Sequence, residues 1–203
     1  MRLFVAVDLA TRVRHAVGGF AADLASRLVS DRLVQRGGAS WVAQENLHLT
    51  LRFIGEVDAD AGTRLTEALA QPFALGAFEL SLERLGVFPP TGPPRVLWIG
   101  VEAGEADLTT LAREVEGRLV AVDIPAEPRP FSGHLTLARF KRPPDRGLRD
   151  ALGRLTPQRP FGPSPVDHVT LYESHLSPSG PTYRVLARAP LGNADPAASR
   201  RRP

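Results

Sequence analysis

The chain has 203 residues and a mass of 21.9 kDa, which suits one compact unit or two small lobes sharing a core, and its 43% hydrophobic and 23% charged content is ordinary for a soluble globular protein. The absence of cysteine excludes disulfide scaffolds, thiol nucleophiles, zinc fingers and iron–sulfur clusters. No apolar run approaches the roughly 18 residues of a membrane span, and the N-terminal run breaks at Asp8, too early for a signal peptide. We therefore expect a cytoplasmic protein.

The charge balance needs separate attention, because a sequence pI of 10.1 suggests a nucleic-acid partner. The net charge is only +3, and the three arginines at 200–202 equal that excess. Only one basic residue, Lys141, is a lysine, so little titrates between histidine and arginine and the pI is high for so small an excess. Global basicity thus indicates no partner.

Hydrophobic periodicity and turn residues predict strands and helices in alternation. Strands are expected over 2–8, 41–57, 78–87, 95–101, 131–140, 166–173 and 183–189. Helices are expected over 11–33, 58–69, 108–120 and 146–155. Residues 193–203, rich in Ala, Pro and Arg, are predicted to be a disordered tail.

Two segment pairs indicate an internal duplication within residues 1–192. The segment 48–53, His-Leu-Thr-Leu-Arg-Phe, is similar to 134–140 at an offset of 86 residues, and 91–97 is similar to 179–186 with glycines offset by 88. Each copy would hold an H-x-T strand, a helix and a hairpin. We expect an α+β fold, a single bilobal domain of two pseudo-symmetric lobes. Each lobe would have a mainly antiparallel sheet and outer helices, with the H-x-T strands lining a central cleft.

The H-x-T strands carry the chemistry of the prediction. Alternation along a strand puts His48 with Thr50, and His134 with Thr136, on one face, and the intervening leucines on the other. Two imidazoles can serve as general base and general acid, and two hydroxyls can donate hydrogen bonds to a phosphate. Such a set needs no metal when the leaving group belongs to a strained cyclic phosphate.

A structural explanation of the same pattern stays open, because a single H-x-T is more often structural than catalytic and a duplicated structural strand would repeat it. A third copy, His168 to Thr170, has no repeat partner, and we interpret His168 as a solvent-side or sheet-packing residue. His15 is expected on the surface of the first helix, and His175 at a turn.

The two H-L-T-L segments, the opening Arg-Leu-Phe-Val-Ala-Val-Asp-Leu and the segments at 45–56, 95–100 and 171–174 resemble the 2H phosphoesterase superfamily. More narrowly, they are similar to the bacterial RNA 2′,3′-cyclic phosphodiesterase, or 2′-5′ RNA ligase, family. The resemblance covers about residues 1–192. It implies a bilobal α+β fold and metal-independent hydrolysis of an RNA terminal 2′,3′-cyclic phosphate to a 2′-phosphate, with reversible ATP-independent 2′-5′ ligation as the family's second activity.

Carried over onto this sequence, the resemblance implies that His48 and His134 are catalytic and that Thr50 and Thr136 bind the phosphate. Our hypothesis gives His48 the role of general acid and His134 that of general base, and the near symmetry leaves the reverse open. No cofactor or metal is implied. The expected partner is RNA with a cyclic phosphate terminus, bound by a monomer with no membrane and no obligate protein partner.

The second motif of the family continues to an arginine, here Arg139, which we expect to bind the phosphate. Strict alternation places Arg139 on the other face of the strand from His134, so a bulge or the strand's end must turn it toward the cleft. Arg52, four residues after His48, faces the cleft by parity or lies at its rim. Gly133 stands where many relatives have proline, which gives a looser approach to the motif.

The basic run at 139–149 is either a solvated face or a surface that steers the RNA backbone. Phe4, Phe53 and Phe140 either stack a terminal base or belong to the core. Three alternative functions remain: a non-catalytic RNA-binding module, a 2H enzyme for another cyclic phosphodiester such as ADP-ribose cyclic phosphate, and, less favoured for lack of acidic partners, a metallohydrolase.

Overall fold

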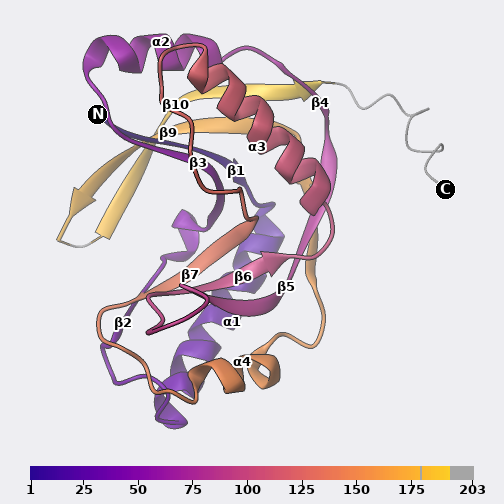
Figure 1. Ribbon diagram of the computed structural model, residues 1–203. Helices are drawn as coiled ribbons and strands as arrows, with labels where there is room; N and C mark the ends of the chain where they lie inside the picture. The colour runs from indigo at the N-terminus through magenta and orange to yellow at the C-terminus, as the bar shows by residue number, and fades with distance from the viewer. Residues whose placement is uncertain (179, 193–203) are drawn as a thin grey trace.

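The computed structural model describes residues 1–178 and 180–192 (Figure 1). The helices are α1 (Thr11–Ser30), α2 (Ala59–Leu69), α3 (Glu105–Val120) and α4 (Leu148–Leu155), with a 3-10 turn, η1, at Gln44–Asn46. The strands are β1 (Arg2–Asp8), β2 (Ala39–Trp41), β3 (His48–Glu56), β4 (Phe73–Gly76), β5 (Phe78–Phe88), β6 (Val96–Val101), β7 (His134–Phe140), β8 (Phe161–Val166), β9 (His168–Ser177) and β10 (Gly180–Gly192).

The strands form one hydrogen-bonded path in the order β4-β10-β9-β1-β3-β7-β6-β5-β8, with β2 added on β7. Every pairing is antiparallel except that of β10 with β4. The expected α+β class with mainly antiparallel pairing is therefore confirmed. Because the path is continuous, the division into two lobes and the duplication behind it stay predictions.

The two H-x-T strands, β3 and β7, are neighbours at the centre of this path, with Leu49 opposite Leu135. The hairpin that follows β3 in the chain, β5–β6, lies beside β7, and the hairpin that follows β7, β9–β10, lies beside β1. The first half of the chain thus supplies the hairpin next to β7, and the second half supplies the hairpin that is separated from β3 by β1.

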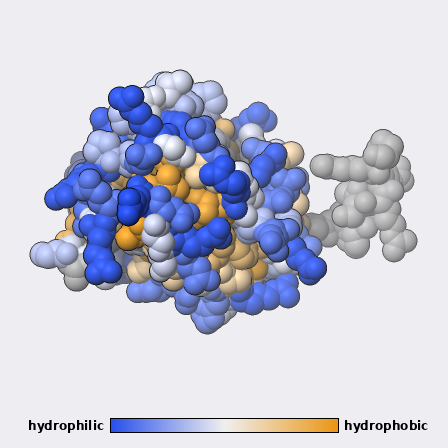
Figure 2. Space-filling model, turned by 90° about the horizontal axis from the view of Figure 1, so that it is seen from below, coloured by the Kyte–Doolittle hydropathy of each residue, from blue (hydrophilic) through white to orange (hydrophobic). Residues whose placement is uncertain are grey.

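Helices cover the strands at both ends of the molecule, α2 and α3 in the upper part of Figure 1 and α1 and α4 in the lower part. The side of α1 that faces the strands is apolar and buried: Val13, Val17, Ala21, Leu24 and Leu28. Asp58 caps α2, since its carboxylate accepts a hydrogen bond from the Ala61 N–H at 2.8 Å. Seen from below, hydrophilic side chains surround a smaller apolar area (Figure 2).

Several details differ from the expectation. β4 and β8 were not predicted, and both lie at the ends of the strand path, where β8 carries Pro163 and Pro165. Proline lacks an N–H and is tolerated at such an edge. The expected strand over 41–57 is divided into β2, η1 and β3. The predicted tail at 193–203 lies outside the described residues. In the described ranges, no helix is long and apolar enough to cross a membrane.

Candidate active site

The four motif side chains lie on one face of the central strands. Leu49 and Leu135, opposite each other, are 1% and 0% exposed, so they form the buried side. One residue further out on each strand, this antiparallel register sets His48 opposite Thr136 and Thr50 opposite His134. The pairing is crossed, with each imidazole beside a hydroxyl of the other strand.

Both histidines are held by the same backbone device. The Nδ1 atoms of His48 and His134 each lie 2.8 Å from a carbonyl oxygen two residues earlier, that of Asn46 and that of Ser132. A carbonyl only accepts, so each neutral imidazole carries its proton on Nδ1 and keeps the lone pair on Nε2. The Nε2 of His48 lies 3.1 Å from the Thr50 hydroxyl. Both rings thus present Nε2 for proton transfer.

Aromatic rings enclose His48. Phe4 stacks on the imidazole at 4.8 Å, Tyr183 meets it edge-on at 5.4 Å, and Tyr172 lies at 6.4 Å. Burial lowers the pKa of His48, although the Asn46 carbonyl and the Asp8 charge both act to raise it. Asp8 is the cross-strand partner of His48, so a carboxylate stands beside the imidazolium whenever it forms.

His134 has a different setting. Phe88 meets its ring edge-on at 4.9 Å, and Trp98 lies at 6.2 Å. Burial is the main cause that lowers the pKa of His134, and the positive charge of Arg139 lowers it further. No carboxylate contributes to this shift. Both histidines are therefore neutral over most of the range near pH 7, and only His48 has an acidic neighbour.

Each motif strand contains an extra residue directly after its threonine. Along β7, Thr136 pairs with Trp98 and Ala138 with Leu97, so Leu137 is unmatched. This bulge reverses the alternation and turns Arg139 to the face of His134, as the sequence required. The Arg139 charge lowers the pKa of both His48 and His134, so one guanidinium acts on both imidazoles.

The corresponding bulge in β3 is at Leu51, 86 residues before Leu137. Thr50 pairs with Ala6 and Arg52 with Val5, which leaves Leu51 unmatched. The parity that would place Arg52 on the face of His48 therefore does not hold.

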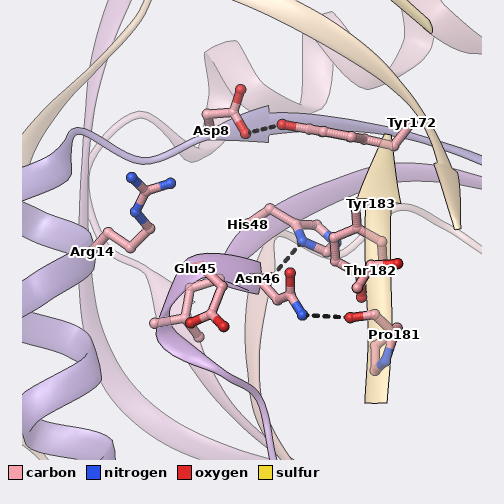
Figure 3. A pocket seen from close by; sticks show the side chains of 10 residues that line it. Asp8, Arg14, Glu45, Asn46, His48, Tyr172, Pro181, Thr182 and Tyr183 are labelled. Atoms are coloured by element: carbon pink, nitrogen blue, oxygen red, sulfur yellow. Dashed lines mark hydrogen bonds between the residues drawn. The ribbon is translucent and has the colours of Figure 1, made fainter. Parts of the chain in front are cut away.

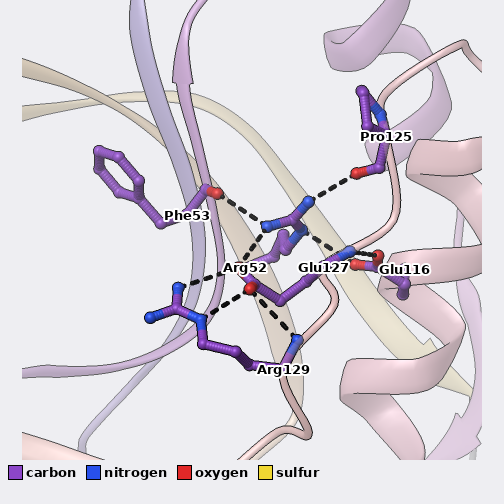
Figure 4. A network of polar contacts seen from close by, with 6 residues as sticks. All are labelled: Arg52, Phe53, Glu116, Pro125, Glu127 and Arg129. Carbon is purple, nitrogen blue, oxygen red and sulfur yellow. Dashed lines mark hydrogen bonds and ion pairs between the residues drawn. The ribbon is translucent and has the colours of Figure 1, made fainter.

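Arg52 instead connects β3 to α3 and to the loop before β7 (Figure 4). Its Nε lies 3.0 Å from Glu116, and its guanidinium donates to Glu127 at 2.9 Å and to the Pro125 carbonyl at 2.7 Å. Only 13% of the side chain is exposed. Arg52 thus restrains the chain that leads to Ser132 and His134, without pointing at the motif face.

Next to His48, Asp8 collects hydrogen bonds from β9 and β10. Its carboxylate accepts from Tyr172 Oη at 2.6 Å, Thr170 Oγ1 at 3.1 Å, His168 Nε2 at 3.2 Å and Arg188 Nη2 at 3.2 Å. Burial opposes ionisation, yet the bonds from His168, Tyr172 and Thr170 lower the pKa of Asp8 to about 2. The bond to Asp8 and a second one to Asp167 in turn raise the pKa of His168. The histidine and the threonine of the third H-x-T, His168 and Thr170, therefore donate hydrogen bonds to Asp8.

A pocket of about 390 Å³ borders His48 (Figure 3). Its lining residues come from β1, α1, the η1 segment, β9 and β10: Asp8, Arg14, Glu45, Asn46, Leu47, His48, Tyr172, Pro181, Thr182 and Tyr183. The volume lies in the range of small-molecule sites, roughly 300–1,000 Å³. His134 is not part of the lining, so the pocket extends from the motif face on the side of His48.

Sequence reasoning missed the pocket residues Asp8, Arg14, Tyr172 and Tyr183, which are distant in the chain and meet only through the pairing of β1, β9 and β10. The one usable signal was the conspicuous Asp8 at the end of the first strand.

Of the predicted phenylalanines, Phe4 stacks on His48, Phe53 is 48% exposed under the Arg2 guanidinium, and Phe140 packs against the core. His15 is exposed on α1, as expected, whereas His175 lies within β9.

Gly133, in place of a proline, has a packing reason. A Cβ at this position would lie 3.1 Å from Leu108 and 3.3 Å from Val101, tighter than most real contacts. In the basic run, Arg149 donates to the carbonyls of Pro89 and Gly92. Among the described residues, no group of three or more His, Asp or Glu side chains is arranged to hold a metal ion.

A model of the 2'-5' RNA ligase superfamily matches residues 20–178. The chain is 37% identical over 186 residues to an RNA 2',3'-cyclic phosphodiesterase of Archaeoglobus fulgidus, a match covering 92% of this chain and 98% of the relative. It is 34% identical over 190 residues to one of Thermotoga maritima, with 92% and 93% covered. The crystal structure of TT0787 of Thermus thermophilus is similar with a TM-score of 0.68 and 33% identity, covering 95% of this chain and 99% of that one. E. coli LigT complexed with 3'-AMP gives a TM-score of 0.65 and 26% identity, with 95% and 98% covered. By sequence and by fold, the chain belongs to the 2'-5' RNA ligase superfamily.

Proposed function

We propose that this protein hydrolyses the terminal 2′,3′-cyclic phosphate of RNA to a 2′-phosphate, without a metal ion. The observation that carries the proposal is the pair of imidazoles, each fixed at Nδ1 by a backbone carbonyl and each with Nε2 on the motif face. The relatives named RNA 2',3'-cyclic phosphodiesterase support the substrate.

The proposed reaction is a single in-line displacement. The Nε2 of His134 takes a proton from water as its oxygen attacks phosphorus, and the bond from phosphorus to O3′ breaks. Protonated His48 gives its proton to O3′, which leaves a 3′-hydroxyl and a 2′-phosphate. Thr50, Thr136 and Arg139 hold the non-bridging oxygens and offset the charge that develops there. Run in the same direction with an RNA 5′-hydroxyl in place of water, the displacement forms a 2′-5′ linkage and frees the 3′-hydroxyl; attack of that 3′-hydroxyl on the linkage is the reverse reaction.

The surroundings favour these roles over their reverse. Burial lowers the pKa of both histidines, but at His48 the charge of Asp8 acts in the opposite direction and favours the protonated form that a general acid needs. No carboxylate favours the protonated form of His134, whose neutral form is the one that accepts a proton from water.

The test is product analysis on a short RNA with a 2′,3′-cyclic phosphate end, in the presence of a chelator. We expect a 2′-phosphate product, and a loss of roughly 10²–10⁴-fold in kcat for His48→Ala and for His134→Ala. His15→Ala, an exposed histidine on α1, is the matched control and should keep wild-type activity.

Binding of the RNA without turnover would favour the non-catalytic module, and turnover of ADP-ribose cyclic phosphate alone would favour the other enzymatic alternative. Loss of activity with the chelator, or activity above about a tenth of wild type in both histidine variants, would contradict the mechanism.

A further inference from the structure

The pocket beside His48 contains a cation that no described residue neutralises. Arg14, in the first turn of α1, extends toward the space that Asp8 and His48 border (Figure 3). Its side chain is half-buried, and within residues 1–178 and 180–192 no hydrogen bond or ion pair is found for its guanidinium. A guanidinium that lines a pocket without a partner among the described residues keeps its N–H donors available to a ligand.

The carboxylates of the pocket do not supply that partner. Asp8 already accepts hydrogen bonds from four donors of β9 and β10. Glu45 is exposed on the η1 segment and makes no ion pair with Arg14. The pocket therefore keeps one positive charge whose fork of N–H donors matches the geometry of a phosphate.

The direction of the pocket indicates which phosphate this is, on the basis of the proposed function. In an in-line displacement the leaving O3′ lies on the side of the acid, His48, and water on the side of His134. The pocket borders His48 and not His134, so the nucleoside that carries the cyclic phosphate extends into it. Tyr172 and Tyr183 provide aromatic walls suited to a nucleoside.

From this placement we propose that Arg14 binds the 5′-phosphate of the terminal nucleotide, the phosphodiester that joins it to the rest of the RNA. The protein then recognises the end of an RNA chain in preference to a free nucleoside 2′,3′-cyclic phosphate. Arg14 is a binding residue that the H-x-T motifs do not reveal.

The test compares three substrates with the same base: the nucleoside 2′,3′-cyclic phosphate, its 5′-phosphorylated form, and a dinucleotide ending in the cyclic phosphate. We expect Arg14→Gln to lower kcat/KM by about 10–100-fold for the two substrates with a 5′-phosphate group. The nucleoside substrate, which lacks that group, should change by less than about 2-fold. Arg14→Lys should keep part of the preference because it keeps the charge.

Arg27→Gln is the matched control, since it removes the same charge from an exposed position on the same helix and should affect all three substrates equally and little. A change in the 5′-phosphorylated mononucleotide but not in the dinucleotide would show that the site takes a terminal monoester and would overturn the RNA assignment.

The inference would be overturned if the wild type hydrolyses all three substrates and Arg14→Gln slows all of them equally or slows none. The proposed function would then remain intact. Failure of the wild-type protein to hydrolyse any of them would refute the proposed function itself.

Discussion

Arg52 and Arg139 each follow a bulge, and their replacement by glutamine should have opposite effects. Arg52→Gln should lower stability and keep activity, whereas Arg139→Gln should keep stability and lower activity. Arg52 holds Glu116, Glu127 and the Pro125 carbonyl, with 13% of its side chain exposed. Removing one partner of a buried pair costs about 3–5 kcal/mol, and an exposed pair about 0–1 kcal/mol. Because both carboxylates are 27% exposed, we expect Arg52→Gln to lower the free energy of unfolding by about 2–3 kcal/mol.

For a chain of this size, 1 kcal/mol shifts Tm by about 2–4 °C, so Arg52→Gln should melt about 4–12 °C below the wild type. Arg139 is exposed and makes no hydrogen bond or ion pair within the described ranges, so Arg139→Gln should change stability by less than about 0.5 kcal/mol. Its kcat/KM on a cyclic-phosphate RNA should nevertheless fall at least about 10-fold.

The assay is thermal unfolding of both variants, with hydrolysis measured well below either Tm. We expect Arg52→Gln to keep activity within a few-fold of wild type while it is folded. Normal stability with lost activity in Arg52→Gln, together with an active Arg139→Gln, would show that the parity of an unbroken strand was right and the bulges misplaced.

Two further predictions concern the neighbours of the histidines. Asp8→Asn should lower the free energy of unfolding near pH 5.5 by about 1–2 kcal/mol, allowing for solvent at this partly exposed group. The pKa of Asp8 is about 2 in the folded protein against 3.8 in the unfolded chain. The difference in unfolding free energy between wild type and Asp8→Asn, measured by urea unfolding, should therefore be present above about pH 4 and be lost as the pH falls toward 2. A difference independent of pH would contradict this prediction. Gly86→Ala should cost about 1–3 kcal/mol and shift the Trp98 fluorescence, because its Cβ would lie 2.1 Å from the Trp98 ring, and an unchanged spectrum would refute this contact.

Sequence periodicity predicted seven strands and four helices because their apolar residues face a core in regular spacing. The edge strand β8 was missed because its prolines argue against a central strand, whereas proline is tolerated in a strand at the edge of a sheet. Alternation alone predicts which face of the strand carries His48, Thr50, His134 and Thr136. The faces on which residues after Leu51 and Leu137 lie depend on bulges, and no residue near them in the sequence indicates a bulge. The pocket was invisible because it depends on which distant strands pair.

The two motif strands have nearly the same sequence, so any difference between their histidines must come from the strands beside them. β1 brings Asp8 next to His48, and β9 and β10 keep that carboxylate ionised through Tyr172 and its neighbours. β5 and β6 bring only rings, Phe88 and Trp98, next to His134. A symmetric pair of imidazoles would transfer protons in either direction equally well. The unequal flanks break that symmetry: in the proposed reaction the acid, the leaving group and the pocket with Arg14 lie on the side of His48, and water on the side of His134.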